Sequence, residues 1–264
     1  MEYLFRFGKQ SCSFSLPVLS VIIIFHSPVF LLMLPKVVIP LKPDNPKSRL
    51  SSVLSDAERQ TLLRLTLEHV VTVLKCAGIR DLDVLSKSPL PETIEKSIRT
   101  SFDDYENKRT VRILTDERDL NTAVNFYLKS SGPVLIVMAD LALVRPENVK
   151  KMIEPIQNPD ETKNERFIRI APGKGGGTNM IYIGAPDVFD VKYHGQSFRK
   201  HLDEAKTLNL PVEIYDSFYT SVDIDEPDDL TEILIHGEGD LYQFARDILS
   251  IQETNGRNKP EHKK

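Results

Sequence analysis

The sequence has few cysteines and no excess of positive charge, and each shortage argues against a class of protein. Its 264 residues include only two cysteines, Cys12 and Cys76, which form no Cys-x-x-Cys pair. A disulfide framework and a structural zinc site are therefore disfavoured, and a reducing cytoplasm is the expected location. The net charge is −4 and the isoelectric point is near 5.9, so the chain lacks the basic character of a nucleic-acid-binding protein.

Familiar catalytic motifs are also missing. The six histidines stand in no Ser-His-Asp or Cys-His context, and His69 falls within the apolar pattern of a predicted helix. The glycine-rich segment 171–179 is not a Walker A loop, because neither Ser nor Thr follows Lys174 and a strand is predicted after it. There are no internal repeats. Candidate functional residues must therefore be sought at the ends of predicted strands.

The chain does have enough apolar sequence for one large core. Hydrophobic residues make up 41% of it, which suits a single α/β domain with embellishments. Strands alternate with helices, and this predicts a three-layer α/β/α fold with a mostly parallel, mixed sheet. The strands are predicted at 36–40, 82–85, 110–114, 133–140, 166–170, 180–183, 211–215 and 221–224. A capping box of Ser55 and Glu58 is predicted to begin the first helix, and Asp119 and Ser197 are predicted to cap two later ones. Other helices are predicted to begin at Pro91, Pro146 and Pro227, and a last helix ends near Ile251.

Both ends of the chain are predicted to lie outside this domain. Residues 1–34 form an apolar extension with basic residues near its start, long enough for a signal sequence or membrane anchor. Two prolines and a histidine interrupt it, so we favour a dispensable or misassigned extension, with membrane contact only if the apolar run is a real anchor. The domain itself is predicted at 35–251. Residues 252–264 are polar and are predicted to form a disordered tail.

The predicted strand 133–140 organises the rest of the chain. It contains five consecutive large apolar residues and ends in Asp140, a pattern typical of a central strand buried on both faces. Open α/β sheets bind ligands at the carboxyl ends of their strands, although an aspartate here can also simply begin a turn. Asp223 and Asp225 favour the ligand interpretation. In a strand, both of their side chains point to one face, which suits a divalent cation.

Two loops supply further candidates. Prolines forbid a helix in residues 41–50, an extended loop whose cations Lys42, Lys47 and Arg49 could clamp phosphates or simply be solvated. The glycines of segment 171–179 allow a ligand to approach the backbone, although a bare flexible hairpin is the alternative. Its side chains that could contact anionic or hydroxyl groups are Lys174, Thr178 and Asn179. Cations for phosphates and carboxylates for Mg²⁺ together indicate phosphoryl or nucleotidyl transfer.

One helix start adds a polar side chain to these candidates. Asn121 lies in the first turn of the helix that Asp119 is predicted to cap. From there its amide could reach a base or a ribose, or it could be an ordinary surface amide.

Several motifs, in the same order along residues 33–237, resemble the 2-phospho-L-lactate guanylyltransferase family. They are residues 39–43, 45–51, Ala139-Asp140-Leu141, Gly176-Gly177-Thr178-Asn179, and 221–225 with Asp229-Leu230. The resemblance implies the fold of nucleotide-diphospho-sugar transferases and molybdenum-cofactor guanylyltransferases. It also implies a reaction that joins GTP to 2-phospho-L-lactate, or in relatives to phosphoenolpyruvate, with release of diphosphate in coenzyme F-420 biosynthesis.

The same resemblance implies roles for individual residues. Mg²⁺ is the implied cofactor, bound by Asp140, Asp223 and Asp225, and catalysis is assigned to Asp140 and Lys47. The implied substrate-binding residues are Lys42 and Arg49 at the triphosphate, Asn121, Lys174, Gly177 and Asn179 around the nucleotide and acceptor, and Thr178 and Ser197 at the acceptor phosphate. The family tends towards homodimers, for which this sequence carries no interface signature.

One segment departs from the family pattern. Where the family reads Phe-Gly-Pro-x-Ser-Phe, this chain reads Tyr-His-Gly-Gln-Ser-Phe at 193–198, and His194 replaces a glycine. The acceptor therefore stays open between phospholactate and phosphoenolpyruvate. In either case we expect the acceptor phosphate to attack the α-phosphorus of GTP in line, without a general base.

Two other functions compete with this one. The first is another transferase of similar fold, either a sugar-phosphate nucleotidyltransferase or a glycosyltransferase with an Asp-x-Asp motif. The second is a non-catalytic nucleotide-binding or membrane-tethered module.

Overall fold

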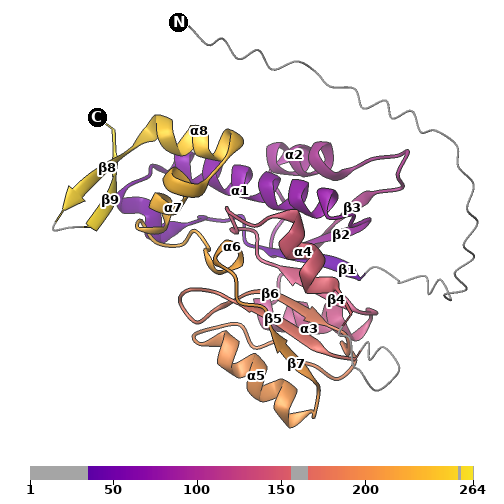
Figure 1. The fold of residues 1–264 in the computed structure, drawn as a ribbon. Helices are drawn as coiled ribbons and strands as arrows, with labels where there is room; N and C mark the ends of the chain where they lie inside the picture. The colour runs from indigo at the N-terminus through magenta and orange to yellow at the C-terminus, as the bar shows by residue number, and fades with distance from the viewer. Residues whose placement is uncertain (1–34, 156–165, 255–256, 264) are drawn as a thin grey trace, which may run out of the picture. The chain divides into compact units, whose positions relative to one another are not determined.

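A seven-stranded mixed sheet forms the centre of the structure. The computed structural model describes residues 35–155, 166–254 and 257–263. The strands of the sheet are β1 (Lys36–Leu41), β2 (Asp81–Ser86), β3 (Thr110–Thr115), β4 (Val134–Val137), β5 (Ile168–Pro172), β6 (Thr178–Ile183) and β7 (Val212–Ile214). Their spatial order is β3-β2-β1-β4-β6-β5-β7 (Figure 1). Strand β6 runs antiparallel to β4 and β5, whereas the other pairs are parallel.

Helices cover both faces of the sheet. On one face, α1 (Asp56–Cys76), α2 (Glu92–Phe102) and α4 (Pro146–Ile153) share a core with Ile39 and Val137. On the other face, α3 (Leu120–Lys129) and α5 (Ser197–Thr207) share a core with Val38 and Ile136. Successive side chains of a strand point to opposite faces, which is why neighbours in β1 and β4 enter different cores. The predicted three-layer α/β/α fold is confirmed.

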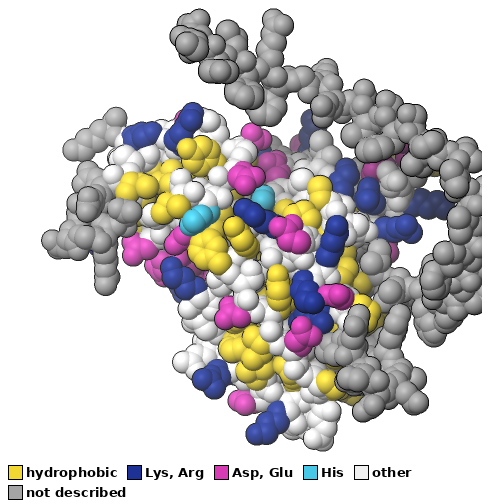
Figure 2. Space-filling view, viewed as in Figure 1, with side chains coloured by type: hydrophobic (Ala, Val, Ile, Leu, Met, Phe, Trp, Pro, Cys, Tyr) yellow, Lys and Arg dark blue, Asp and Glu magenta, His cyan; other side chains and the backbone are white. Residues whose placement is uncertain are grey.

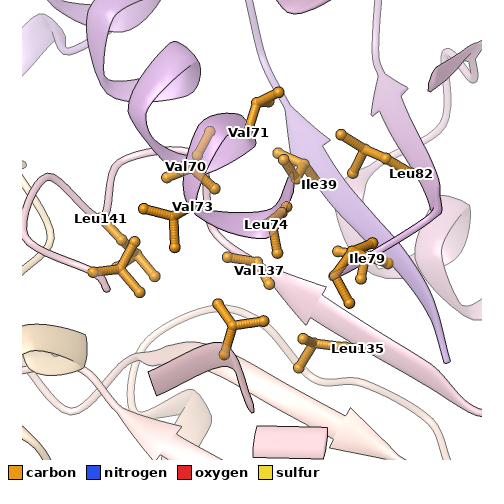
Figure 3. Close-up of a cluster of buried hydrophobic side chains, with 14 of the residues drawn as sticks. Ile39, Val70, Val71, Val73, Leu74, Ile79, Leu82, Leu135, Val137 and Leu141 are labelled. Atoms are coloured by element: carbon orange, nitrogen blue, oxygen red, sulfur yellow. The ribbon is translucent and has the colours of Figure 1, made fainter. Parts of the chain in front are cut away.

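Strand β4 lies in the middle of this packing, as the sequence predicts. All four of its residues are fully buried. Figure 3 shows side chains of α1, among them Val70 and Leu74, beside Ile39 of β1 and Val137 of β4. Burying each such apolar side chain contributes roughly 1.5–3 kcal/mol. Strand β4 is thereby held firmly, and so is the start of the segment that carries Asp140 beyond its carboxyl end.

The predicted helix ends are largely confirmed. Ser55 and Glu58 form the expected capping box at the start of α1, and Gly78, with φ +95°, follows the end of that helix. Asp119 caps α3, and Pro146 is the first residue of α4. The expected cap at Ser197 is wrong, because this residue is the first residue of α5 and Gln196 is its N-cap.

The segment 221–224 is not the strand that the sequence predicts. Its first residue, Ser221, ends the short helix α6 (Phe218–Ser221), and the residues after it do not join the sheet. Val222 and Ile224 are buried in a third core, which includes residues of α7 (Asp229–His236) and α8 (Gly239–Ile248). Buried apolar residues therefore still alternate with less buried aspartates, as they would in a strand: Val222 and Ile224 point into this core, whereas Asp223 and Asp225 do not.

Two other segments differ from prediction. The loop 41–50 is not extended throughout, because the 3₁₀ helix η1 (Ser48–Ser52) begins within it. After α8 the chain forms an antiparallel pair, β8 (Leu249–Thr254) and β9 (Arg257–His262), where a helix end and a disordered tail were predicted. Backbone pairing between the two strands, which was invisible in the polar composition, accounts for this difference.

The structure describes neither the candidate membrane anchor nor the loop predicted after α4. The apolar extension 1–34 and residues 157–165, which the sequence predicts as a polar loop, lie outside the described residues. None of the helices in the described ranges is long and apolar enough to cross a membrane. Basic and acidic side chains both appear across the face shown in Figure 2, in keeping with the balanced charge of the sequence.

Candidate active site

Lys47 joins two of the predicted aspartates at the carboxyl edge of the sheet. Its Nζ donates a hydrogen bond to Asp140 Oδ2 at 2.6 Å and another to Asp225 Oδ1 at 2.9 Å. The Lys47 side chain is only 8% exposed. Burial disfavours the charged ammonium, but the attraction of the two carboxylates outweighs it and raises the pKa of Lys47. This is a charge-assisted, partly buried ion cluster rather than a solvated basic loop.

The backbone around these residues places them. Lys47 has φ +52°, and Asn45 before it has φ +44°, so the chain turns sharply before η1. The buried Arg59 of α1 holds this turn by donating to Pro46 O at 3.2 Å and to Asn45 Oδ1 at 3.2 Å. On the other side, Ile224 N donates to Asp140 O at 3.2 Å, which ties the acidic segment to the chain beyond β4.

Asp223 is the third carboxylate of the site. Its Oδ1 accepts a hydrogen bond from Asn179 Nδ2 at 3.2 Å, and the same amide donates to Thr220 O at 3.0 Å. Burial raises the pKa of Asp223, and the negative charges of Asp140 and Asp225 raise it further. The three predicted carboxylates are therefore close enough to repel one another.

The carboxylates have the chemistry of a divalent-cation site. Asp140 Oδ1 is buried without a hydrogen-bond partner in the described structure, which is costly for a carboxylate oxygen. A hard divalent cation would satisfy this oxygen and offset the repulsion among the three aspartates. Even so, no group of three or more His, Cys, Asp or Glu side chains in the described ranges is arranged ready for a metal ion. The ammonium of Lys47 occupies two of the carboxylate oxygens.

A cavity of about 290 Å³ opens beside this cluster. It lies at the carboxyl end of β1, and the predicted phosphate-binding residues Lys42, Lys47 and Arg49 all line it together with Asp140 and Asp225. The Arg49 guanidinium is exposed and pairs with Glu226 at 3.2 Å and, more loosely, with Asp225 at 3.7 Å. We call this space the charged cavity.

A second space, the apolar cavity, adjoins the first. It measures about 390 Å³, and both cavities are lined by Pro40, Leu41, Lys42 and Met138. Its apolar lining also includes Leu85, Leu120 and Ala123, and its polar lining includes Ser86, Lys87, Asp116, Arg118, Asp119 and His194. An apolar space next to a cation-rich one can take a flat ring and a chain of phosphates at once.

Asn121 lines neither cavity and holds a neighbouring segment instead. Its Nδ2 donates to Tyr193 O at 2.8 Å, and its Oδ1 accepts from Tyr193 N at 2.7 Å. Asn125, one turn later on α3, makes the same pair of bonds with Val191, at 3.2 and 2.7 Å. The two amides act like a neighbouring strand and keep residues 191–193 extended.

His194 follows directly after this clamped segment. It has φ +125°, a backbone conformation that a residue with a side chain adopts only under strain, and Lys200 Nζ donates to its carbonyl oxygen at 2.7 Å. Such strain persists where the surroundings enforce it, commonly at functional sites. Here the enforced backbone places His194 on the wall of the apolar cavity.

Thr178 and Ser197 are buried and line neither cavity. Thr178 Oγ1 lies 2.9 Å from His201 Nδ1, and Ser197 Oγ donates to Thr178 Oγ1 at 3.3 Å. Lys192 N donates to His201 Nε2 at 2.8 Å, so a neutral His201 carries its proton on Nδ1 and donates it to Thr178. Burial lowers the pKa of His201 to about 4, with help from nearby lysines. The sequence offered no signal for His201 beyond its place in an amphipathic helix.

The glycine-rich segment approaches the carboxylates through its backbone. Lys174 N donates to Ser221 O at 2.9 Å, while the Lys174 side chain is exposed. Neither Lys174 nor Gly177 lines either cavity. A Cβ atom on Gly173 would lie 2.6 Å from Asn179 Oδ1. Gly173 therefore leaves room for the amide that binds Asp223. This role was not predicted from the sequence.

Comparisons with known proteins find similar sequences and a similar fold. The model of a family described as guanylyl transferase CofC like matches residues 35–258. The 2-phospho-L-lactate guanylyltransferase of Methanosarcina mazei is 42% identical over 223 residues, covering 84% of this chain and 97% of its own length. That of Archaeoglobus fulgidus is 38% identical over 223 residues, covering 83% and 94%. A solved structure described as a putative nucleotide-diphospho-sugar transferase from Desulfovibrio desulfuricans is similar, with a TM-score of 0.58 at 16% sequence identity. The match covers 80% of this chain and 93% of the other chain, and it supports the α/β/α fold.

Proposed function

This chain belongs to the CofC-like guanylyl transferase family, and we propose that it joins GTP to 2-phospho-L-lactate with release of diphosphate, a step of coenzyme F-420 biosynthesis. The relatives named for this activity are matched over nearly their whole length. The observation that carries the proposal is the cluster of Lys47, Asp140 and Asp225 in a cation-lined cavity beside an apolar one. Phosphoenolpyruvate is the alternative acceptor.

The two cavities could hold different parts of the nucleotide. The triphosphate would lie in the charged cavity, where Lys42, Lys47 and Arg49 can offset its negative charge. The base would lie in the apolar cavity, whose apolar lining suits a flat ring. The α-phosphorus would then lie near the boundary, close to Lys42 and Met138.

The reaction needs no proton transfer by the protein. The acceptor phosphate is largely dianionic at neutral pH, since its second pKa is about 6. One of its oxygens would form a bond to the α-phosphorus while the bond from that phosphorus to the β-phosphate bridging oxygen breaks, releasing diphosphate. The protein contributes mainly by holding the reactants in line and offsetting their charge.

Asp140, Asp223 and Asp225 would hold a divalent cation, for which Mg²⁺ is the expected choice. Two observations support this: Asp140 Oδ1 has no hydrogen-bond partner within the described ranges, and the carboxylates repel one another. When bound, the cation would supply positive charge against the phosphates.

Release of diphosphate tests the proposed function. We expect it on mixing the protein with GTP, Mg²⁺ and phospholactate, and not when the acceptor is omitted. A parallel series with phosphoenolpyruvate, and with ATP, CTP and UTP in place of GTP, would identify the acceptor and the nucleotide. An Asp-x-Asp glycosyltransferase would release no diphosphate in any of these mixtures. GTP binding without diphosphate release, over the same panel, would overturn the proposal in favour of a non-catalytic nucleotide-binding module.

A further inference from the structure

Lys47 is set apart from the other cations of the charged cavity. Its side chain is 8% exposed, whereas that of Arg49 is 66% exposed, and Lys42 is exposed as well. Lys42 makes no ion pair within 4 Å to a described residue, but Lys47 contacts two carboxylates at 2.6 and 2.9 Å. The ammonium thus occupies Asp140 Oδ2 and Asp225 Oδ1, oxygens for which a divalent cation at the same aspartates would compete.

We propose that Lys47 is an exchangeable counter-ion: its ammonium neutralises Asp140 and Asp225 until a divalent cation binds, and then moves to the triphosphate. This inference rests on the proposed cation-dependent transfer and adds to it a competition between a residue and the metal. Lys47 is here a positioning residue for the cation and a binding residue for the nucleotide.

Charge makes the two positions exclusive. A singly charged ammonium and a doubly charged ion that share the same carboxylates repel each other at a few ångströms. Asp140 Oδ1 has no hydrogen-bond partner among the described residues, so a cation that binds there would still face the ammonium on Oδ2. We therefore expect the ammonium to leave as both aspartates bind the ion.

The surroundings allow the side chain to move while its backbone stays. Leu50 N donates to Lys47 O at 2.9 Å, and Arg59 holds Asn45 and Pro46 just before it. The flexible four-carbon stem of lysine can then turn the ammonium away from the aspartates. Lys47 lines the charged cavity, so its ammonium can move into that space and meet the phosphates of a bound nucleotide there.

The exchange predicts effects of opposite sign when the ammonium is removed. Without nucleotide, a Lys47→Met variant should bind a divalent cation more tightly, because its competitor is gone. With nucleotide, the same variant should bind GTP less tightly, because a phosphate partner is gone. A lysine that only neutralised the aspartates, or only bound phosphate, would not produce both changes.

The first measurement uses Mn²⁺ alone as the probe, followed by the loss of its free-ion paramagnetic resonance signal. We expect Lys47→Met to bind Mn²⁺ about tenfold more tightly than the wild type in the absence of GTP. Lys42→Met is the matched control, because it removes an equal charge from the same cavity without touching a carboxylate. Its Mn²⁺ affinity should stay within about twofold of the wild type. Unchanged or weaker Mn²⁺ binding by Lys47→Met, or an equal gain in both variants, would overturn the proposal.

The second measurement titrates GTP at saturating Mn²⁺ by calorimetry. Lys47→Met should weaken GTP binding about tenfold, a loss of the size expected for one charge-assisted contact to phosphate. Unchanged GTP affinity would overturn the second half of the exchange. The Mn²⁺ titration contains neither GTP nor acceptor, so its failure is distinct from a failure of wild-type protein to release diphosphate.

A melting experiment covers the case in which Lys47→Met folds poorly. Without divalent ions, the variant should melt below the wild type because its aspartates are no longer neutralised. Mn²⁺ should restore it and should raise its melting temperature more than that of the wild type. A variant that Mn²⁺ fails to restore would count against the exchange.

Discussion

Replacing Asp140 with asparagine separates the chemistry of the site from its stability. The substitution keeps the shape of the side chain but removes the charge that contacts Lys47 at 2.6 Å and that repels Asp223. We expect turnover to fall by at least about 10³-fold, equivalent to roughly 4 kcal/mol of transition-state stabilisation.

The change in stability is a balance of three terms. Weakening a hydrogen bond between charged groups costs roughly 1.5–3 kcal/mol. Lys47 keeps its second partner, Asp225, at 2.9 Å, so the ammonium is not left alone. Removing one of three mutually repelling carboxylates returns part of the cost. We therefore expect the free energy of unfolding to change by only about 1 kcal/mol, or a melting shift of about 2–4 °C.

Two assays read this prediction. Diphosphate release under saturating GTP and acceptor gives the turnover, and thermal unfolding followed by circular dichroism gives the stability. Asp228→Asn is the matched control, since Asp228 is exposed, makes no side-chain cap to α7 and contacts neither Lys47 nor the cavities. Near-wild-type turnover in Asp140→Asn would refute the central role of Asp140. A melting drop far beyond the expected range would show that the loss of activity reports misfolding.

Three further predictions concern the supporting structure. The pKa of buried His201 falls from an ordinary value near 6.5 to about 4, so the native state favours its neutral form. The contribution of His201 to stability is therefore full above pH 6.5 and is lost as pH falls towards 4, by up to about 3 kcal/mol. Urea unfolding at several pH values should show a flatter dependence of stability on pH in His201→Gln. Gly173→Ala would push a Cβ atom into the amide of Asn179 and should reduce activity and lower stability by about 1–3 kcal/mol by thermal unfolding, whereas Gly175→Ala, with nothing within 4 Å, should do neither. Asn125→Ala removes two hydrogen bonds to the segment before His194, and it should lower stability by about 1–2 kcal/mol and raise KM while leaving kcat nearly unchanged.

Local patterns in the sequence predicted the elements that carry the site. An unbroken apolar run identified strand β4 and, after it, Asp140, because a strand buried on both faces favours such a run. The capping box at Ser55 and the proline at 146 identified helix starts, because these residues satisfy or replace backbone donors at a helix N-terminus. Signals of this kind depend on neighbours a few residues away.

Contacts between distant residues were beyond these patterns. Lys47 and Asp225 are 178 positions apart, and Asn121 and Tyr193 are 72 apart. Nothing local distinguishes an amide that faces a ligand from one that binds a distant backbone, which is why Asn121 was placed at the nucleotide. The segment 221–224 was predicted as a strand for a related reason. Its alternating apolar residues satisfy a core formed by α7 and α8, which serves them as well as a sheet would.

In the proposed exchange, one lysine serves two partners that differ in charge. Three neighbouring carboxylates repel one another, and a triphosphate that entered would bring further negative charge. A side-chain cation fixed beside the carboxylates would oppose binding of the metal ion. One fixed beside the phosphates would leave the negative charge of the aspartates without a counter-ion. An ammonium on a flexible stem, rooted in a turn that Arg59 holds, can reach both positions. The side-chain exposure of Asp225 is 44% and that of Asp140 is 21%, so an ion that arrives from solvent reaches Asp225 more easily. The contact of Lys47 with Asp225 is therefore the one that we expect to break first.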